Sequence, residues 1–202
     1  MRTTLTRAEQ VERNKELVLQ AARRVFLARG YEGATLDAIA EDAGFSKGVV
    51  YSQFTSKADL FLALLEQRVT QRADQNDRLA EELAGPEVVE AAMRLADRLH
   101  EAEPEWSLLV IEFRAHAARD PGLNDRYAQV HARTVARLAG VLTRLHQRAG
   151  TRPPLPATVL AELILAIGSG VALERAANPR ALPADLIGTL MGRVVTAPMG
   201  AS

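Results

Sequence analysis

Residues 35–60, TLDAIAEDAGFSKGVVYSQFTSKADL, constrain the fold of this chain more than any other segment. Thr35 can cap a first short helix, and Gly44 can supply the left-handed residue on which that helix ends. Ser46 then caps a second short helix, and Ser56 opens a third, longer one. The pattern predicts a helix-turn-helix, a unit whose second helix can lie in the major groove of DNA.

The rest of the chain continues this helical pattern. Nearly half of the 202 residues are hydrophobic and few are aromatic, a composition that favours helices over strands. Gly and Pro residues divide the chain into helical segments, and no strand pattern appears between them. We therefore expect an all-α fold of about nine helices. We place the domain boundary inside the helix that Ser56 opens, giving a helix-turn-helix domain over 1–66 and a larger helical domain over 67–202. The predicted longer helices cover residues 6–29, 56–83, 104–119, 157–177 and 184–196. Another is expected from the Gly85–Pro86 break to about 103, and Asp120 and Pro121 are expected to be the N-cap and first residue of a helix with an apolar stripe over 123–145.

Charge and cysteine content exclude several classes of protein. The 25 basic and 25 acidic side chains balance, so DNA binding has to come from local placement of charge. The absence of cysteine excludes disulfides and thiolate metal sites, and fits a cytoplasmic location. The most apolar run, 159–173, is about fifteen residues long and contains Glu162. It is too short for a membrane span, so we expect a buried helix and no membrane partner.

The second helix of the motif has one apolar side and one small, polar side. Val50 and Phe54, four residues apart, are expected to bury its inner face. Lys47 can then contact a phosphate or a guanine edge, and Val49 a thymine methyl. The hydroxyl of Tyr51 is suited to a phosphate oxygen. An ordinary small helical bundle with the same caps is the alternative explanation of this pattern.

The whole motif resembles the tetracycline-repressor (TetR) family of one-component bacterial regulators over about residues 10–66. The matching residues are Phe26, Gly30–Tyr31, Thr35–Ala40, Ala43–Gly48, Tyr51, Phe54, Ser56–Lys57 and Leu60. The resemblance implies phosphate anchors at Thr35, Tyr51 and Lys57. It implies a groove-facing set of Ser46, Lys47, Gly48, Val49 and Ser52.

Two positions depart from the family pattern. The family often has an aromatic residue or His where this chain has Ser52, and His where it has Gln53. A stacking or phosphate contact from Ser52 is therefore in doubt, and Gln53 joins the predicted DNA-binding residues as a neutral donor. The segment is not basic either, because residues 31–60 hold two lysines against five acidic side chains.

For the second domain the resemblance implies dimerisation and the binding of a small molecule. Apolar stripes on the last two helices predict a dimer interface, although packing within one subunit would produce similar stripes. Its predicted residues are Leu160, Leu163, Ile164, Ile167, Val171, Leu186, Ile187, Leu190, Met191 and Val194. A pocket with apolar walls and a few polar groups is expected from Met93, Trp106, Leu109, Phe113, His116 and Tyr127, for which ordinary core packing is the alternative.

Together these features predict a homodimeric, DNA-binding transcriptional regulator. We expect a repressor that binds a palindromic double-stranded operator and is released by a small-molecule effector. Glu112 and His116 share a helix face, but without a third ligand they make a weak metal site. We expect no metal, no cofactor and no enzymatic activity, since neither a nucleophile elbow nor a phosphate loop is present. A helical-bundle enzyme and a helical scaffold that has lost DNA binding remain the rival hypotheses.

Overall fold

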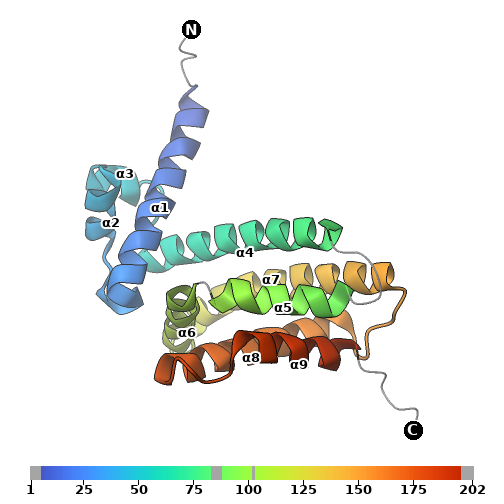
Figure 1. Ribbon diagram of the computed structural model, residues 1–202. Helices are drawn as coiled ribbons and strands as arrows, with labels where there is room; N and C mark the ends of the chain where they lie inside the picture. The colour runs from blue at the N-terminus through green and yellow to red at the C-terminus, as the bar shows by residue number, and fades with distance from the viewer. Residues whose placement is uncertain (1–5, 83–87, 102, 197–202) are drawn as a thin grey trace. The chain divides into compact units, whose positions relative to one another are not determined.

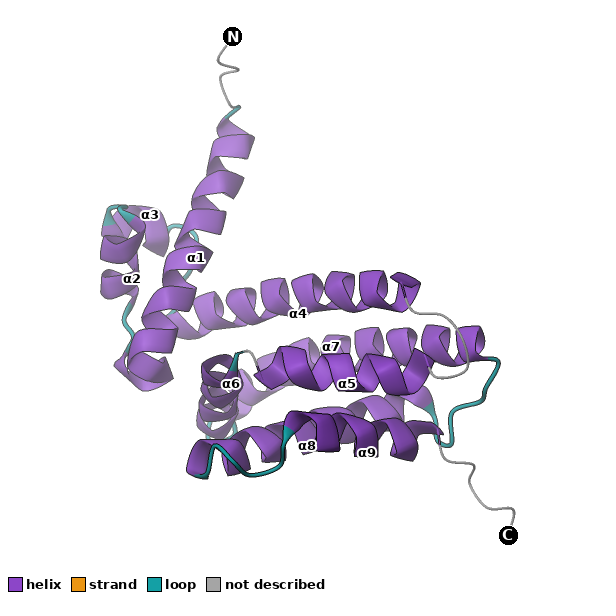
Figure 2. Ribbon diagram, in the orientation of Figure 1, coloured by secondary structure: helices purple, strands orange, loops and turns teal. Residues whose placement is uncertain are grey.

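The computed structural model describes residues 6–82, 88–101 and 103–196. In these ranges all regular secondary structure is helical, joined by loops and turns, and no strand is present (Figures 1 and 2). This confirms the all-α prediction. The helices are α1 Arg7–Gly33, α2 Leu36–Ala43, α3 Lys47–Tyr51, α4 Lys57–Glu82, α5 Val88–Glu101, α6 Pro104–Ala117, α7 Pro121–Ala149, α8 Ala157–Ala177 and α9 Ala184–Thr196.

The chain forms two compact units. The first contains Met1–Arg68 and Glu112–Tyr127, and the second contains Val69–Ile111 and Ala128–Ser202. Each division falls inside a helix, so α4, α6 and α7 each run from one unit into the other. The predicted boundary at 66/67 lies close to the division in α4, but it assigned residues 112–127 to the second domain.

An aromatic cluster explains why residues 112–127 belong to the first unit. The ring of Phe113 stacks on Phe61 with centroids 4.3 Å apart and meets Tyr31 edge-on at 4.9 Å. Phe26 completes the cluster at 5.1 Å from Phe61, and Tyr127 lies 5.9 Å from Phe113. Each such pair adds about 0.5–1.5 kcal/mol beyond the burial of apolar area. Burial raises the pKa of Tyr31 to about 12, so its hydroxyl stays neutral.

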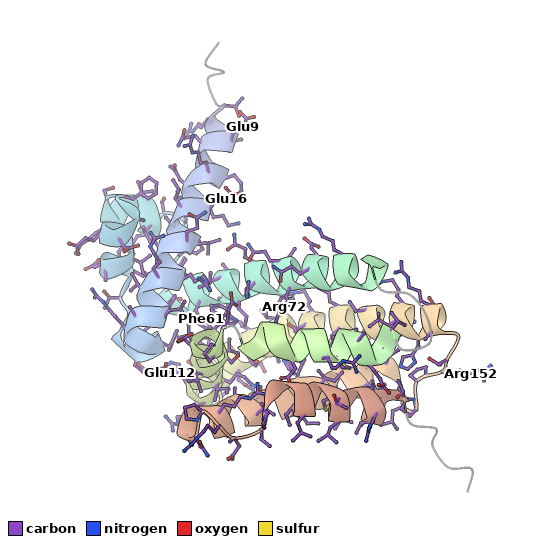
Figure 3. All side chains as sticks on the ribbon, in the orientation of Figure 1. Glu9, Glu16, Phe61, Arg72, Glu112 and Arg152 are labelled. Carbon is purple, nitrogen blue, oxygen red and sulfur yellow. The ribbon has the colours of Figure 1, made fainter. Side chains whose placement is uncertain are left out.

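A carboxylate from α6 caps a break in α1. Gly30 has φ 69°, a conformation that favours glycine, and the helix resumes after it for one further turn. The Glu112 carboxylate accepts hydrogen bonds from the backbone N–H groups of Tyr31 and Glu32, at 3.1 and 3.2 Å. It thereby satisfies donors that a helix start leaves unpaired. Glu112 is labelled in Figure 3. The prediction that the first helix stops at Gly30 missed this last turn. The residue that caps the turn, Glu112, lies 80 positions beyond Glu32 in the chain.

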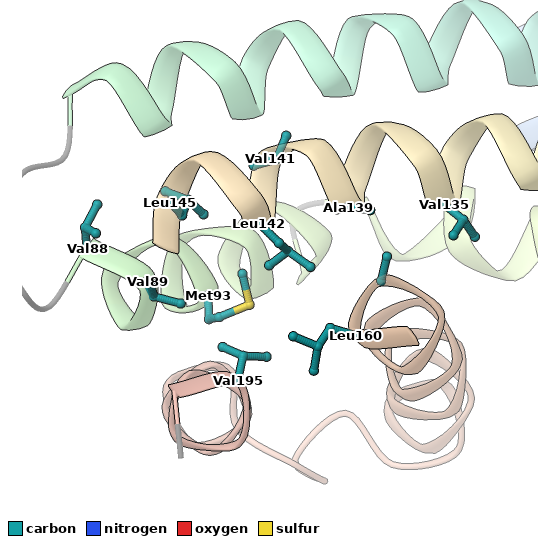
Figure 4. Close-up of a cluster of buried hydrophobic side chains, with 11 residues drawn as sticks. Val88, Val89, Met93, Val135, Ala139, Val141, Leu142, Leu145, Leu160 and Val195 are labelled. Carbon is teal, nitrogen blue, oxygen red and sulfur yellow. The ribbon is translucent and has the colours of Figure 1, made fainter. Parts of the chain in front are cut away.

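The core of the second unit lies between α5, α7, α8 and α9 (Figure 4). Its buried residues are Val88, Val89, Met93, Val135, Ala139, Val141, Leu142, Leu145, Leu160, Ala161 and Val195. Asp97 on α5 ties two further helices together: its carboxylate accepts from the N–H of Gly188 at 3.1 Å and from Arg175 at 3.3 Å. Since this ion pair is largely buried, it is screened less than a surface pair.

His146, near the end of α7, makes the stability of the second unit sensitive to acid. It is 1% exposed, its Nδ1 lies 2.9 Å from the hydroxyl of Thr151, and its Nε2 has no partner among the described residues. Burial disfavours the imidazolium and lowers the pKa of His146 in the folded state. The unfolded chain, with a pKa near 6.5, therefore binds a proton more readily than the folded one.

We predict that the free energy of unfolding falls as pH drops below about 6.5, by at most about 1.4 kcal/mol per pH unit for this site. His146→Asn should flatten this dependence while keeping a partner for Thr151. Urea unfolding of both proteins at pH 7.5 and 5.0 measures the difference, with the other three histidines present in each. Equal pH dependence in the two proteins would show that His146 does not carry the effect.

Candidate nucleic-acid interface

The two short helices have the geometry that their caps predict, with one exception. The Thr35 hydroxyl accepts from the N–H of Ala38 at 3.1 Å and so begins α2. Gly44 ends it with φ 71°. Ser46 occupies the N-cap position of α3, but its side chain makes no capping hydrogen bond. The prediction that its hydroxyl caps the helix was therefore wrong, and the Ser46 carbonyl, which accepts from the N–H of Val49 at 3.0 Å, holds the turn.

The inner and outer faces of α3 are clearly separated. Val50 on α3 is fully buried, and Phe54, three residues after the helix ends at Tyr51, is 5% exposed. Both side chains are buried as predicted, although Phe54 lies outside the helix. The Oε1 of Gln53 is also buried and has no hydrogen-bond partner within the described part of the chain. Half-buried Val49 lies between the two faces. The exposed residues around this helix are Ser46, Lys47, Gly48, Tyr51 and Ser52.

The exposed face of α3 is linked to the start of α2 through Asp37. The Nζ of Lys47 lies 2.5 Å from Asp37 Oδ2, and the hydroxyl of Tyr51 donates to Asp37 Oδ1 at 3.5 Å. The hydrogen bond and the charge of Asp37 raise the pKa of Lys47, so this lysine remains cationic. One carboxylate thus contacts two of the predicted DNA-binding groups, which the sequence did not indicate.

Lys57 begins α4 and also has partners within the first unit. Its Nζ donates to the backbone carbonyl of Glu32 at 3.1 Å and lies 4.6 Å from the centre of the Tyr31 ring. The hydroxyl of Ser56 accepts from the N–H of Asp59 at 3.0 Å, as a capping box requires. The reciprocal bond of a capping box, from the N–H of Ser56 to Asp59, is absent at these described residues. The Asp59 carboxylate bonds instead to Thr55 and Arg126, and these bonds lower its pKa.

The six predicted pocket residues are divided equally between the two units. Phe113 and Tyr127 belong to the aromatic cluster of the first unit, and His116 pairs there with Glu32 at 2.5 Å. Met93 packs in the core of the second unit. Leu109 is buried and Trp106 half-buried on the part of α6 that belongs to that unit.

The predicted dimer residues differ sharply in exposure. Leu160 and Val171 are buried within the subunit, whereas Ile164, Ile187 and Met191 are half-buried. Two exposed stripes with a spacing of four residues remain. They are Val159, Leu163 and Ile167 on α8, and Leu186, Leu190 and Val194 on α9, with exposed fractions from 38% to 52%. Val159 was not among the predicted residues. The spacing of apolar residues does not show which side of a helix is covered when the helix has apolar residues on two sides.

The helix predicted over 159–173 is longer and less buried than expected, although a single apolar helix is weak evidence for a membrane span. α8 has 21 residues, and by length and composition alone it could span a membrane. Only 22% of its most apolar window is buried. The helix extends beyond the apolar run at both ends, which the length argument did not consider.

Family models match both parts of the chain. Residues 18–64 match the model of the bacterial regulatory proteins of the tetR family. Residues 86–197, more than half of the chain, match that of the BetI-type transcriptional repressor C-terminal domain. The second match lies where the sequence offered only apolar stripes.

Individual bacterial regulators are also similar to this chain in sequence. The HTH-type transcriptional repressor AcnR of Corynebacterium diphtheriae is 30% identical over 141 residues, covering 69% of this chain and 67% of AcnR. The HTH-type transcriptional activator FasR of Mycolicibacterium smegmatis is 48% identical over 58 residues, but these cover 29% of this chain and 26% of FasR.

A crystal structure of the transcriptional regulator FadR from Bacillus subtilis, in complex with stearoyl-CoA, shares the fold with a TM-score of 0.70 at 16% identity. The similarity covers 92% of this chain and 99% of FadR. With a helix-turn-helix in the first unit and both family models matched, this chain belongs to the tetR family of bacterial regulatory proteins and is a transcriptional regulator.

Proposed function

We propose that the protein is a homodimeric repressor that binds a palindromic operator through α3 and is released by a small-molecule effector. The observation that carries this proposal is the separation of faces on α3. Val50 anchors the helix in the first unit, while Lys47 and Tyr51 are exposed for contact with DNA. The similarity to the repressor AcnR over 69% of this chain favours repression over activation.

The exposed stripes of α8 and α9 support the homodimer. Apolar side chains repeated every fourth residue on two helices are suited to a four-helix interface with the same helices of a second subunit. A dimer also provides two α3 helices for two half-sites, which lie about 34–36 Å apart in operators of this kind. Glu162 and Glu174 on α8 would be costly in a lipid environment, which favours a protein partner for this surface.

An effector site in the second unit would have a direct covalent route to the DNA-binding unit. Trp106 and Leu109 lie on α6, and the same helix continues into the first unit, where Glu112 caps the last turn of α1. FadR, which shares the fold, was crystallised with stearoyl-CoA. We therefore propose a largely apolar effector contacted by α6. An effector that binds one position of this helix better than another would shift the population of DNA-binding conformations.

Selection of genomic fragments with the purified protein, followed by gel shifts on a selected fragment, tests the proposal. Lys47→Ala should weaken binding at least about tenfold, because each subunit loses a contact worth about 1–3 kcal/mol. The slope of log affinity against log salt should also decrease. Arg180→Ala removes an exposed cation from the loop before α9 and serves as the matched control.

Unchanged affinity in Lys47→Ala would contradict the assignment of α3 as the DNA-binding helix. A reporter placed behind the selected fragment separates repression from activation. Expression should rise when the gene for the regulator is deleted, and a fall would identify an activator.

A further inference from the structure

We propose that Asp37 determines specificity by suppressing the binding of Lys47 to DNA that offers only phosphate. The inference rests on the proposed role of α3 in DNA binding. Asp37 occupies, within the protein, the position that a phosphate would take beside Lys47 and Tyr51. It should therefore lower affinity for non-operator DNA more than affinity for the operator.

The geometry places one carboxylate against both groups. Asp37 lies in the first turn of α2, and its two oxygens face the Nζ of Lys47 at 2.5 Å and the hydroxyl of Tyr51 at 3.5 Å. These are groups that donate hydrogen bonds to phosphate oxygens in protein–DNA complexes. The side chains of Lys47 and Asp37 are 67% and 48% exposed, so an incoming phosphate has access to the pair.

Two other cations of the first unit, Arg24 and Lys57, also have partners within the protein. Arg24 of α1 pairs with Asp42 of α2 at 2.6 Å, and Lys57 donates to the Glu32 carbonyl. Both lysines of residues 31–60 therefore have partners within the protein. Binding that depends on the DNA backbone is sequence-independent and relies on cations of this kind, so internal pairing weakens it selectively.

Operator binding does not require the pair to break. A lysine ammonium has three donors, and one of them bonds to Asp37 in the free protein. Lys47 can keep this bond while another donor contacts a base edge in the groove, and Asp37 then orients the ammonium. On non-operator DNA the phosphate has to displace the Asp37 carboxylate or lie beside it, and like charges repel.

Asp37→Asn tests the proposal, because it removes the charge and keeps the size of the side chain. The free energy of an exposed ion pair of this kind corresponds to a change of about 1.4- to 5-fold in the affinity of Lys47 for a phosphate, in each subunit. We expect a random-sequence duplex to bind the variant about 2- to 25-fold more tightly when both subunits contribute. Affinity for the selected operator fragment should rise less or fall, so the ratio of the two affinities decreases.

Two further variants separate the causes. Glu41→Gln removes the same charge one helical turn further along α2 and should raise non-operator binding much less. In a Lys47→Met background, Asp37→Asn should lose most of its effect. Thermal melting of each variant, followed by circular dichroism, shows that the helices remain folded.

The inference is overturned if Asp37→Asn leaves non-operator binding unchanged, raises both affinities equally, or is matched by Glu41→Gln. Failure of the underlying function has a different signature. If α3 does not bind the operator, Lys47→Met alone leaves operator binding unaltered. If only the inference fails, Lys47→Met binds the operator more weakly, while Asp37→Asn has no effect on binding.

Discussion

Replacing Leu163 on α8 or Leu190 on α9 with Glu is expected to give a monomer that no longer binds its operator. The two leucines are 41% and 46% exposed in the subunit, at the middle of the two apolar stripes. In the proposed dimer a glutamate at either position would be buried without a partner, and removing an unpaired charge from water is costly. A monomer presents only one α3 helix, so the affinity should approach that for non-specific DNA, at least about 10³-fold weaker.

Sedimentation equilibrium gives the mass of each variant, and a gel shift on the selected fragment gives the affinity. Val11→Glu is the matched control for the mass measurement. Val11 is 51% exposed on α1, outside both stripes, and its replacement should leave the dimer intact. A Leu190→Glu protein that remains dimeric would show that another surface holds the subunits together.

Alanine at both Gly188 and Gly192 is expected to destabilise the second unit. A Cβ at Gly188 would lie 2.6 Å from the Cα of Arg94, and a Cβ at Gly192 would lie 3.0 Å from the Cα of Glu90. Both neighbours belong to the backbone of α5, which cannot rotate away as a side chain can, so α9 and α5 have to separate. Overpacking of this kind costs about 1–3 kcal/mol at each position.

Alanine also favours the helix by about 0.8–1 kcal/mol over glycine at each site, so the net loss in the free energy of unfolding for the two sites together should lie between about 0 and 4 kcal/mol. We expect the upper part of this range, because the 2.6 Å contact at Gly188 is with backbone. Urea unfolding measures it. The matched control is Gly140→Ala in α7, where a Cβ would approach only the end of the flexible Arg144 side chain, at 3.4 Å. That variant should be as stable as the wild type or more so. If the protein with alanine at both Gly188 and Gly192 were as stable as the Gly140→Ala protein, the close packing of α9 on α5 would be contradicted.

Short-range signals in the sequence predicted the ends of several helices correctly. Thr35 and Gly44 delimit α2 as expected, and the carboxylate of Asp120 caps α7, which begins at Pro121. Each of these features depends on residues within about one helical turn, so the local sequence is sufficient. Ser46 shows the limit of such reasoning, because a capping residue at the right position does not guarantee that its side chain makes the bond.

The sequence by itself therefore determined the helical fold, the helix-turn-helix and the exposed position of Lys47 on α3. Only the tertiary structure decided which partners these elements have. Glu112 reaches the backbone of Tyr31, and Asp37 reaches Lys47 across the turn between two helices. The choice of the covered face on α8 also depends on which helices pack against it. Such contacts join residues that lie 10 to 81 positions apart in the chain. They are set by the path of the folded chain and leave no periodic signal in the sequence.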